Sequence, residues 1–257
     1  MIHPTAVVDK EAKIGKNVTI GPYAVIGPGV VLGDDNHVAN HVTILGPTTI
    51  GRGNRFYSTC SIGQDPQDKK FKNEVDSRLE IGDHNTIREF VTINRGSAGG
   101  GGVTRLGHHN WIMAYCHIAH DCQVGSYTVM ANAATLAGHV QVGDHVVLGG
   151  FTAVHQFCAI GEHTITGGHT MVGQDIPPFL TASGNRVRPY GINKVGLERT
   201  GFSPQDIQDV QKAYKIFYRS KLGHKEAVER IQAELGHSPH ALRFAAFCRD
   251  STRGVCR

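Results

Sequence analysis

Histidine is the residue type in this sequence that most clearly offers chemistry. The chain holds 16 histidines in 257 residues, and several gather in one stretch, as His117 and His120 in HIAHDC, His139 in LAGHV and His155 in TAVHQF. A neutral histidine can act as a general base toward a substrate hydroxyl when a carboxylate orients it, and Asp121 stands next to His120. Three converging histidines could instead bind a zinc-type ion that activates water. The residues alone leave both chemistries open.

Other sources of catalysis are not indicated by any motif. The sequence has no serine-nucleophile motif, no P-loop and no dinucleotide fingerprint. The run from Gly99 to Gly102 resembles a glycine-rich phosphate loop only in composition, because no helical pattern follows it. We expect that run to be a flexible excursion from the scaffold.

The scaffold that must position the histidines follows from a period of six. An apolar residue recurs at every sixth position in three runs, from Ile14 to Ile62, from Ile81 to Ile93 and from Leu106 to Val172, with Thr166 as the polar exception. This period matches neither a helix nor simple strand alternation and is typical of a β-helix. Each repeat is then one short strand and one turn, with its apolar anchor inside.

Stacking brings the chemical residues together if three repeats close one coil. Residue 121 then lies under residue 139, residue 120 under 138, and residue 137 under 155. The residues that this stacking gathers on one strip are His117, His120, Asp121, Gly138, His139 and His155. A cluster of this kind indicates an enzyme more strongly than any one of its histidines does.

The cysteines and the charge exclude several classes of protein. Four of the six cysteines, Cys60, Cys116, Cys122 and Cys158, stand two residues before an anchor, where we expect small buried side chains rather than metal ligands. The N-terminus has no signal peptide and no run of eighteen apolar residues occurs, so we expect a cytoplasmic chain without stable membrane insertion. A net charge of +4 with no dense basic tract gives no case for nucleic acid.

Phase breaks and a change of period define the organisation. Residues 63–80 and 94–105 interrupt the repeat with polar sequence and are expected to loop out, where binding groups often sit. We predict an all-β parallel β-helix over residues 1–185 and a small α-helical domain over residues 186–257 that covers one open end of the coil.

The helical domain has its own start and stop signals. Ser203 is a credible N-cap with Pro204 at the first helical position, and apolar residues then recur on one helical face. A second helix is expected to stop at Gly236, and a third to cover about residues 239–249.

Several motifs together resemble the UDP-N-acetylglucosamine 3-O-acyltransferase family, whose members open lipid A synthesis. The motifs are the hexads, HIAHDC, TLAGHV, GGFTAVHQFC, QDIPPF, GFSP and STRG, and they span essentially the whole chain. The resemblance implies a left-handed β-helix, a homotrimer with active sites in the clefts between subunits, and no metal or other cofactor. The implied reaction moves an (R)-3-hydroxyacyl chain from acyl carrier protein to the 3-hydroxyl of UDP-N-acetylglucosamine.

The resemblance also implies roles for individual residues. His120 is the general base, Asp121 is its partner, and the main-chain N–H of Gly138 holds the oxyanion of the tetrahedral intermediate. The residues expected to contact the sugar nucleotide are Asp68, Lys70, His117, His139, His155, Gln156, Asn193 and Arg199. The residues expected at the acyl-chain pocket are Gly150, Gly168 and Arg186. Cationic residues concentrate near the tail, which suits an acidic carrier protein.

The sequence departs from the family pattern at Asn94, Arg186, Val195 and Thr200. These changes cluster around substrate contacts, so a UDP-sugar with an amine at its 3-position is an alternative acceptor. A γ-type carbonic anhydrase, which needs three metal-binding histidines, is a more remote alternative. The N-acyltransferase of the same pathway has an additional N-terminal domain, and a purely structural coil would leave the histidine strip unexplained.

Overall fold

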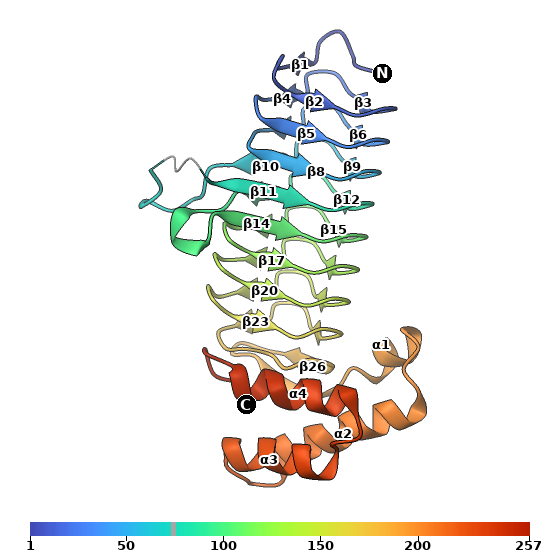
Figure 1. Cartoon of the computed structure of the whole chain (residues 1–257), viewed down its shortest axis with the longest axis vertical. Coiled ribbons are helices and arrows are strands. Elements are labelled where there is room, and N and C mark those ends of the chain that lie inside the picture. The colour runs from blue at the N-terminus through green and yellow to red at the C-terminus, as the bar shows by residue number, and fades with distance from the viewer. Residues whose placement is uncertain (73–75) are drawn as a thin grey trace.

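The strands of the chain stack into one coil of three sheets. The computed structural model describes residues 1–72 and 76–257. Within these residues all neighbouring strands pair in parallel except the last two (Figure 1). In the third repeat run, paired residues in neighbouring coils stand eighteen positions apart, as His117 and Thr135 do. The predicted parallel β-helix is confirmed.

Each coil contributes one short strand to each sheet. The first sheet holds β1 (Val7–Val8), β4 (Val25–Ile26), β7 (Thr43–Ile44), β10 (Ser61–Gln64), β13 (Thr92–Asn94), β16 (His117–Ile118), β19 (Thr135–Leu136), β22 (Ala153–Val154) and β25 (Met171–Val172). The second sheet holds β2 (Lys13–Ile14), β5 (Val30–Leu32), β8 (Thr48–Ile50), β11 (Arg78–Ile81), β14 (Val103–Leu106), β17 (Gln123–Val124), β20 (Gln141–Val142) and β23 (Ala159–Ile160). The third sheet holds β3 (Thr19–Ile20), β6 (His37–Val38), β9 (Arg55–Phe56), β12 (Thr86–Ile87), β15 (Trp111–Ile112), β18 (Val129–Met130), β21 (Val147–Leu148), β24 (Ile165–Thr166), β26 (Leu180–Ser183) and β27 (Arg188–Ile192).

The interior is built from the anchors and the small residues that precede them. Ile118 and Leu136 are fully buried anchors, and Cys116 and Ala134, two residues earlier, are fully buried beside them. Removing this apolar surface from water is the main stabilising term of the coil. The polar exception Thr166 is also buried, and its hydroxyl accepts a hydrogen bond from the Gly149 N–H at 3.0 Å.

The corners between the sheets carry stacked rings. Many corner residues have a positive φ, which projects their side chains outward one above another. At the corner between the second and third sheets, His84, His109, Tyr127, His145 and His163 form a continuous stack with ring centroids 4.6–5.1 Å apart. Four of the 16 histidines therefore belong to this aromatic ladder.

The two insertions are shorter than the sequence indicated. Strand β10 continues to Gln64 and β11 begins at Arg78, so the first excursion covers residues 65–77, of which residues 73–75 lie outside the described part. Strand β13 continues to Asn94 and β14 begins at Val103, so the second excursion covers residues 95–102, with the 3₁₀ helix η1 (Ala98–Gly100) inside it. In both excursions the parallel ladder extends into residues that the hexad pattern does not reach.

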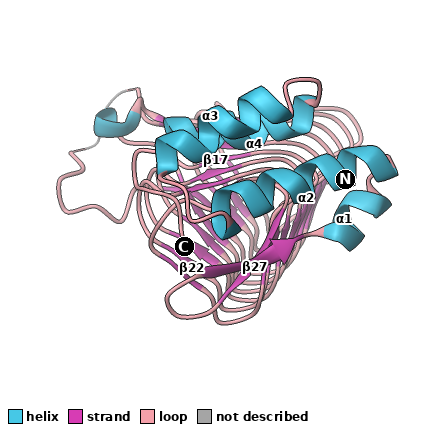
Figure 2. Ribbon diagram, turned by 90° about the horizontal axis from the view of Figure 1, so that it is seen from below, coloured by secondary structure: helices cyan, strands magenta, loops and turns pink. Residues whose placement is uncertain are grey.

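The C-terminal segment forms a helical layer over one end of the coil. It contains α1 (Lys194–Arg199), α2 (Pro204–Arg219), α3 (His224–Glu234) and α4 (Pro239–Asp250). Figure 2, which looks onto this end, shows the helices lying across the triangular section of the coil. The expected start of α2 is confirmed, because Ser203 is the N-cap before Pro204 and forms a capping box with Asp206.

Two details of the C-terminal prediction are wrong. Residues 188–192, placed in the helical domain, form β27, which pairs antiparallel with β26 and extends the third sheet. Helix α3 ends at Glu234 rather than at Gly236, since Leu235 already leaves helical geometry. Among the described residues, no helix has the length and apolar character needed to cross a bilayer.

Candidate active site

The centre of the site is a hydrogen-bonded pair of adjacent residues. His120 Nδ1 lies 2.7 Å from Asp121 Oδ2, at the corner between the first and second sheets. Neighbouring side chains rarely face each other, but here Asp121 has a φ of 61°, which turns its carboxylate back toward the imidazole. A carboxylate at Nδ1 holds the proton there, so Nε2 is left as the basic nitrogen.

Asp121 is buried and fully provided with donors. Its side chain is 0% exposed, and Ser97 donates to it twice, from N–H to Oδ1 at 2.9 Å and from Oγ to Oδ2 at 2.6 Å. The Asp121 N–H in turn donates to Thr104 Oγ1 at 2.8 Å. Burial raises the pKa of the Asp121 carboxyl, but the hydrogen bonds from His120 and Ser97 outweigh it, and that pKa lies below its ordinary value. The group therefore stays ionised at neutral pH.

Gly138 packs directly against the His120 ring. A Cβ placed on Gly138 would lie 2.7 Å from His120 Cε1 and 2.8 Å from Nε2, so no side chain fits between the two coils here. The carbonyl of Gly138 accepts the Phe157 N–H at 3.1 Å, whereas its own N–H has no acceptor among the described residues. A free main-chain donor thus stands beside the basic nitrogen, as the oxyanion role requires.

His139 and His117 complete the wall around the dyad. His139 Nδ1 lies 3.9 Å from Asp121 Oδ2, and its ring stacks on Phe157 with centroids 4.4 Å apart. His117 Nδ1 lies 2.7 Å from Thr92 Oγ1 on the neighbouring coil. Burial lowers the pKa of both His139 and His117, so both imidazoles are held neutral.

His155 is reached by the C-terminal tail. Arg253 Nη2 lies 3.2 Å from His155 Nδ1, across 98 positions of sequence, and also donates to the Gly173 carbonyl at 3.4 Å. His155 and Gln156 are exposed, one coil beyond His139 along the same corner. The tail is fixed there because Asp175 accepts Ser251 Oγ at 2.7 Å.

The first insertion is clamped against the coil by Arg95. Its Nη2 forms a 2.6 Å ion pair with Asp65, its Nη1 donates to the Gly46 carbonyl at 2.9 Å, and its guanidinium lies 5.5 Å from the Phe71 ring centre. The insertion carries Asp68, which is half-buried and accepts the main-chain N–H of Lys70 at 2.9 Å. Lys70 itself is exposed.

The remaining predicted site residues do not reach His120 within one chain. Gly150 and Gly168 stack at the corner between the third and first sheets. Asn193 caps α1 and donates to the His163 carbonyl at 2.8 Å, near the far end of the coil. The exposed cations Arg186 and Arg199 also lie at that end, in the β26–β27 connection and at the end of α1.

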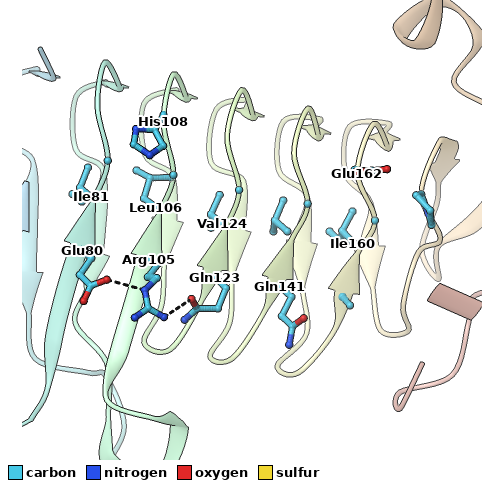
Figure 3. Close-up of a pocket in the computed structure, with 18 of the residues that line it drawn as sticks. Glu80, Ile81, Arg105, Leu106, His108, Gln123, Val124, Gln141, Ile160 and Glu162 are labelled. Atoms are coloured by element: carbon cyan, nitrogen blue, oxygen red, sulfur yellow. Dashed lines mark hydrogen bonds and ion pairs between the residues drawn. The ribbon is translucent and has the colours of Figure 1, made fainter. Parts of the chain in front are cut away.

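Two hollows border the site. A cavity of about 700 Å³ is lined by residues of this corner and of the tail, namely Arg78, Gly100, Gly101, Val103, Arg105, Asp121, Gln123, His139, Gln141, Phe157 and Thr252. A second groove of about 770 Å³ runs along the second sheet and ends against α4 (Figure 3). In that groove Arg105 bridges Glu80 at 2.7 Å and Gln123 at 3.4 Å, and Figure 3 shows the three side chains in one row. Asp121 and His139 line the first cavity and not the second groove, so the first cavity is the one that borders the dyad.

Among the described residues, the dyad together with His139 is the group whose ligand atoms are close enough to hold a metal ion. Ligand atoms of His120, Asp121 and His139 lie within 4.8 Å of one another. One carboxylate and two imidazoles differ from the set of three histidines that a γ-type anhydrase needs, and His120 Nδ1 is already hydrogen-bonded to Asp121.

Four residues that shape the site were not among the predicted site residues. Asp121 is contacted by Ser97 and Thr104, the first insertion by Arg95, and His155 by Arg253. All four lie outside the hexad pattern or at its edge. The phase break at residues 94–105 was the available signal for Ser97, since a loop beside a catalytic corner has to pack somewhere. The expected flexible excursion at Gly99 to Gly102 is wrong in part, because Gly100 lies against the Asp121 side chain.

Family models match two parts of the chain. A model described as Udp N-acetylglucosamine O-acyltransferase, domain 2, matches residues 175–256. A bacterial transferase hexapeptide model of six repeats matches residues 11–46 and 104–138.

Curated relatives match along the full length. The acyl-[acyl-carrier-protein]–UDP-N-acetylglucosamine O-acyltransferase of Thermodesulfovibrio yellowstonii is 48% identical over 256 residues, and that of Halorhodospira halophila is 49% identical over 256 residues. The enzyme of the same name from Janthinobacterium sp. is 53% identical over 261 residues. Each match covers 100% of this chain and 99% of the relative.

Solved structures of similar proteins superpose closely. The UDP-N-acetylglucosamine acyltransferase of Francisella novicida has a TM-score of 0.97 and 42% identity, covering 100% of this chain and 94% of its own. LpxA from Acinetobacter baumannii has a TM-score of 0.97 and 40% identity, covering 100% and 99%. The expected left-handed β-helix with C-terminal helices is confirmed by this likeness.

Proposed function

This chain belongs to the UDP-N-acetylglucosamine O-acyltransferase family of hexapeptide-repeat enzymes, and we propose that it makes the acylated UDP-sugar that opens lipid A synthesis. The relatives' names supply the acyl donor, acyl carrier protein, and the acceptor, UDP-N-acetylglucosamine. The acyl group is an (R)-3-hydroxyacyl chain and the acceptor atom is the sugar 3-hydroxyl. The observation that carries the mechanism is the 2.7 Å bond between His120 Nδ1 and the buried Asp121 carboxylate.

The chemistry follows from the two free groups beside this bond. His120 Nε2 takes the proton of the 3-hydroxyl as the oxygen attacks the thioester carbonyl of the carrier protein. The carbonyl oxygen becomes an oxyanion that accepts the Gly138 N–H. When the tetrahedral intermediate collapses, the carbon–sulfur bond breaks and the imidazolium returns its proton to the departing thiolate. Asp121 stays ionised throughout and stabilises the imidazolium.

Substrate contacts extend from the dyad in both directions along the corner. We assign His117, His139, His155 and Gln156 to the sugar-nucleotide cleft, since they share the first-sheet side of this corner or follow it coil by coil. Neutral imidazoles can donate one hydrogen bond and accept another, which suits sugar hydroxyls. Asp68 and Lys70 join them from the first insertion, which Arg95 holds against the coil.

A second and third copy of the chain complete each site in this proposal. Asn193, Arg199 and Arg186 lie near the far end of the coil, and Gly150 and Gly168 lie at another corner, so one chain cannot present them all to His120. A homotrimer would place the corner of one subunit that carries Gly168 against the corner of the next that carries His120. Arg199 would then bind a phosphate of the nucleotide, and Gly168 would leave room for a long acyl chain.

Mixed trimers test the shared site directly. His120→Ala and Arg199→Ala chains are each expected to be inactive alone, because each removes one part of every site. Co-expressed, they should form trimers in which some clefts keep both residues, so part of the activity returns. No recovery in trimers shown by mass to contain both chains would exclude a site shared between subunits.

The donor side can be tested through charge. Arg188, Arg219 and Lys221 lie together, lining one pocket between β27 and the end of α2. Steering of an acidic carrier protein by these cations is screened by salt. The KM for acyl carrier protein should therefore rise with ionic strength more steeply than the KM for the sugar nucleotide. Because its donor is a soluble carrier protein, we place the reaction in the cytoplasm.

The decisive assay compares acceptors and acyl chains. Purified protein is given UDP-N-acetylglucosamine or its 3-amino analogue with acyl carrier proteins of several chain lengths, and the product is identified by mass. Transfer to the 3-hydroxyl, lost in His120→Ala, is the expected result. Preference for the 3-amino sugar would establish the N-acyl alternative, which the departures at Asn94, Arg186, Val195 and Thr200 motivate. Stoichiometric zinc with carbon dioxide hydration and no acyl transfer would exclude both.

A further inference from the structure

Ser97, in the second insertion, contacts the buried carboxylate of the dyad twice. Its N–H donates to Asp121 Oδ1 at 2.9 Å and its hydroxyl donates to Asp121 Oδ2 at 2.6 Å. The same Oδ2 accepts the 2.7 Å bond from His120 Nδ1. Ser97 thus bonds both carboxylate oxygens while His120 bonds one of them, and the carboxylate cannot rotate without breaking one of these bonds.

The insertion that carries Ser97 is itself folded tightly. The Ser97 carbonyl accepts the N–H groups of Gly100 at 3.0 Å and Gly102 at 2.9 Å. The preceding residue, Gly96, donates its N–H to the Arg78 carbonyl at 3.0 Å, and its carbonyl accepts the Ser77 hydroxyl at 2.5 Å. Ser97 is 7% exposed. Because these bonds fix the main chain around Ser97, Ser97 can hold the Asp121 carboxylate in one orientation.

We propose that Ser97 is a positioning residue for acyl transfer, which acts by fixing the Asp121 carboxylate that orients the His120 base. The inference rests on the proposed function, since it assumes that His120 is the base. Nothing in the geometry lets Ser97 reach the substrate first: both of its polar hydrogens point at Asp121. Its role is therefore in the efficiency of the proton transfer and not in binding.

The physical reason is the cost of leaving a buried carboxylate without donors. The Asp121 side chain is 0% exposed, so its carboxylate oxygens take their hydrogen bonds from Ser97 and His120 rather than from bulk water. The ionisable side chains that face it are His120 and His139, with the buried Cys122 adjacent in sequence. With the hydroxyl gone, one of the bonds that lower the pKa of Asp121 is lost and that pKa rises, and the carboxylate is freer to turn its Oδ2 away from His120.

Three single variants separate positioning from simple stability. Ser97→Ala removes one donor and is expected to lower kcat about 10- to 100-fold with KM changed less than about threefold. Its acidic limb of kcat should move to higher pH, because activity needs ionised Asp121. Ser97→Thr keeps the hydroxyl and should retain most of the activity. Ser77→Ala is the matched control, since Ser77 is equally buried and bonds the same insertion without touching the dyad.

The outcomes distinguish the inference from its premise. If wild-type protein performs acyl transfer but Ser97→Ala and Ser77→Ala lower kcat equally with no shift in the pH profile, Ser97 is structural and the inference is wrong. If wild-type protein performs no acyl transfer, the proposed function fails first.

A double variant gives a second test, whose expected result a loss of stability would not produce. In a His120→Ala background no base remains to be oriented, so adding Ser97→Ala should leave the residual rate unchanged. A further loss of the same size as in the wild-type background would show that Ser97 acts on something other than the dyad. Thermal unfolding of each variant shows whether the compared proteins are folded.

Discussion

Gly138→Ala is the substitution that most directly tests where the His120 ring lies. Gly138 has no positive φ, and the stacked corner positions of the neighbouring coils carry side chains, His120 and Gln156. The backbone therefore accepts an ordinary residue at this position. Glycine is needed only because a Cβ would lie 2.7 Å from Cε1 and 2.8 Å from Nε2 of His120.

The magnitude follows from that contact. Ordinary carbon contacts begin near roughly 3.5 Å, so the imidazole has to move by about 1 Å. A displacement of this size of a catalytic group costs on the order of 100-fold in rate, or about 2.7 kcal/mol of transition-state stabilisation. The Gly138 N–H survives the substitution, so the loss reports the position of the ring rather than a missing oxyanion donor. We expect kcat to fall about 100-fold while KM for the sugar nucleotide changes little.

The assay is steady-state acyl transfer with both substrates varied, with Gly191→Ala as control. An added Cβ on Gly191 meets no described heavy atom within 4 Å, so this variant should match wild type. In a His120→Ala background the ring is gone and Gly138→Ala should cost nothing more. A Gly138→Ala enzyme that keeps a third or more of the wild-type kcat would refute the placement of His120 as the base.

Three further predictions concern stability and reactivity. Burial lowers the pKa of His163 to about 4, so between pH 4 and 6.5 the native protein binds fewer protons at this residue than the unfolded chain, and stability falls as the pH drops through this window. The free energy of unfolding, measured with denaturant, should fall by about 2.5 kcal/mol between pH 7.5 and 4.5, and by less in His163→Gln. Asp175→Ala removes a buried carboxylate that accepts hydrogen bonds from the Ala159 N–H and the Ser251 hydroxyl, each at 2.7 Å, and should lower the free energy of unfolding by about 3 kcal/mol. Hydrogen exchange in residues 251–257 should become faster, and an unchanged exchange rate there would contradict the anchoring role of Asp175. Burial raises the pKa of the Cys60 and Cys122 thiols to about 12, so neither should react with a thiol reagent at pH 8 until the protein unfolds. Labelling of either cysteine in the native protein would disprove its burial.

The repeat could be read from the sequence because each anchor carries its own signal. Ile118 is apolar and Cys116 is small, and the residues at these two positions of a hexad point into the coil, so their burial follows from the repeat pattern alone. The start of α2 was predictable for the same reason, since the Ser203 and Asp206 side chains accept each other's main-chain N–H and Pro204 has no N–H to satisfy.

The coil also let the sequence place part of the site. A fixed eighteen-residue coil converts sequence separation into position, so Gly138 against His120 and His139 above Asp121 followed from arithmetic. The roles of these residues came from the family resemblance and not from the spacing.

Contacts that leave the coil could not be derived in this way. Ser97 reaches Asp121 across 24 positions, and Arg253 reaches His155 across 98, through loops whose path no period describes. Strand β27 escaped detection because its pairing with β26 is decided by the hairpin and not by a hexad. The ladder of stacked histidines likewise needed the positive φ of the corners to be distinguished from catalytic histidines.

The sequence by itself thus determined the β-helix, the buried cysteines and the strip that holds His120 and Asp121, since regular stacking makes local pattern equivalent to three-dimensional position. Only the tertiary structure showed that Asp121 bonds His120 at Nδ1, what holds that carboxylate, and that Asn193 and Gly168 lie elsewhere on the coil of one chain. The physical reason is that hydrogen bonds to a buried group depend on where irregular loops pack, and loop packing is settled by the whole fold.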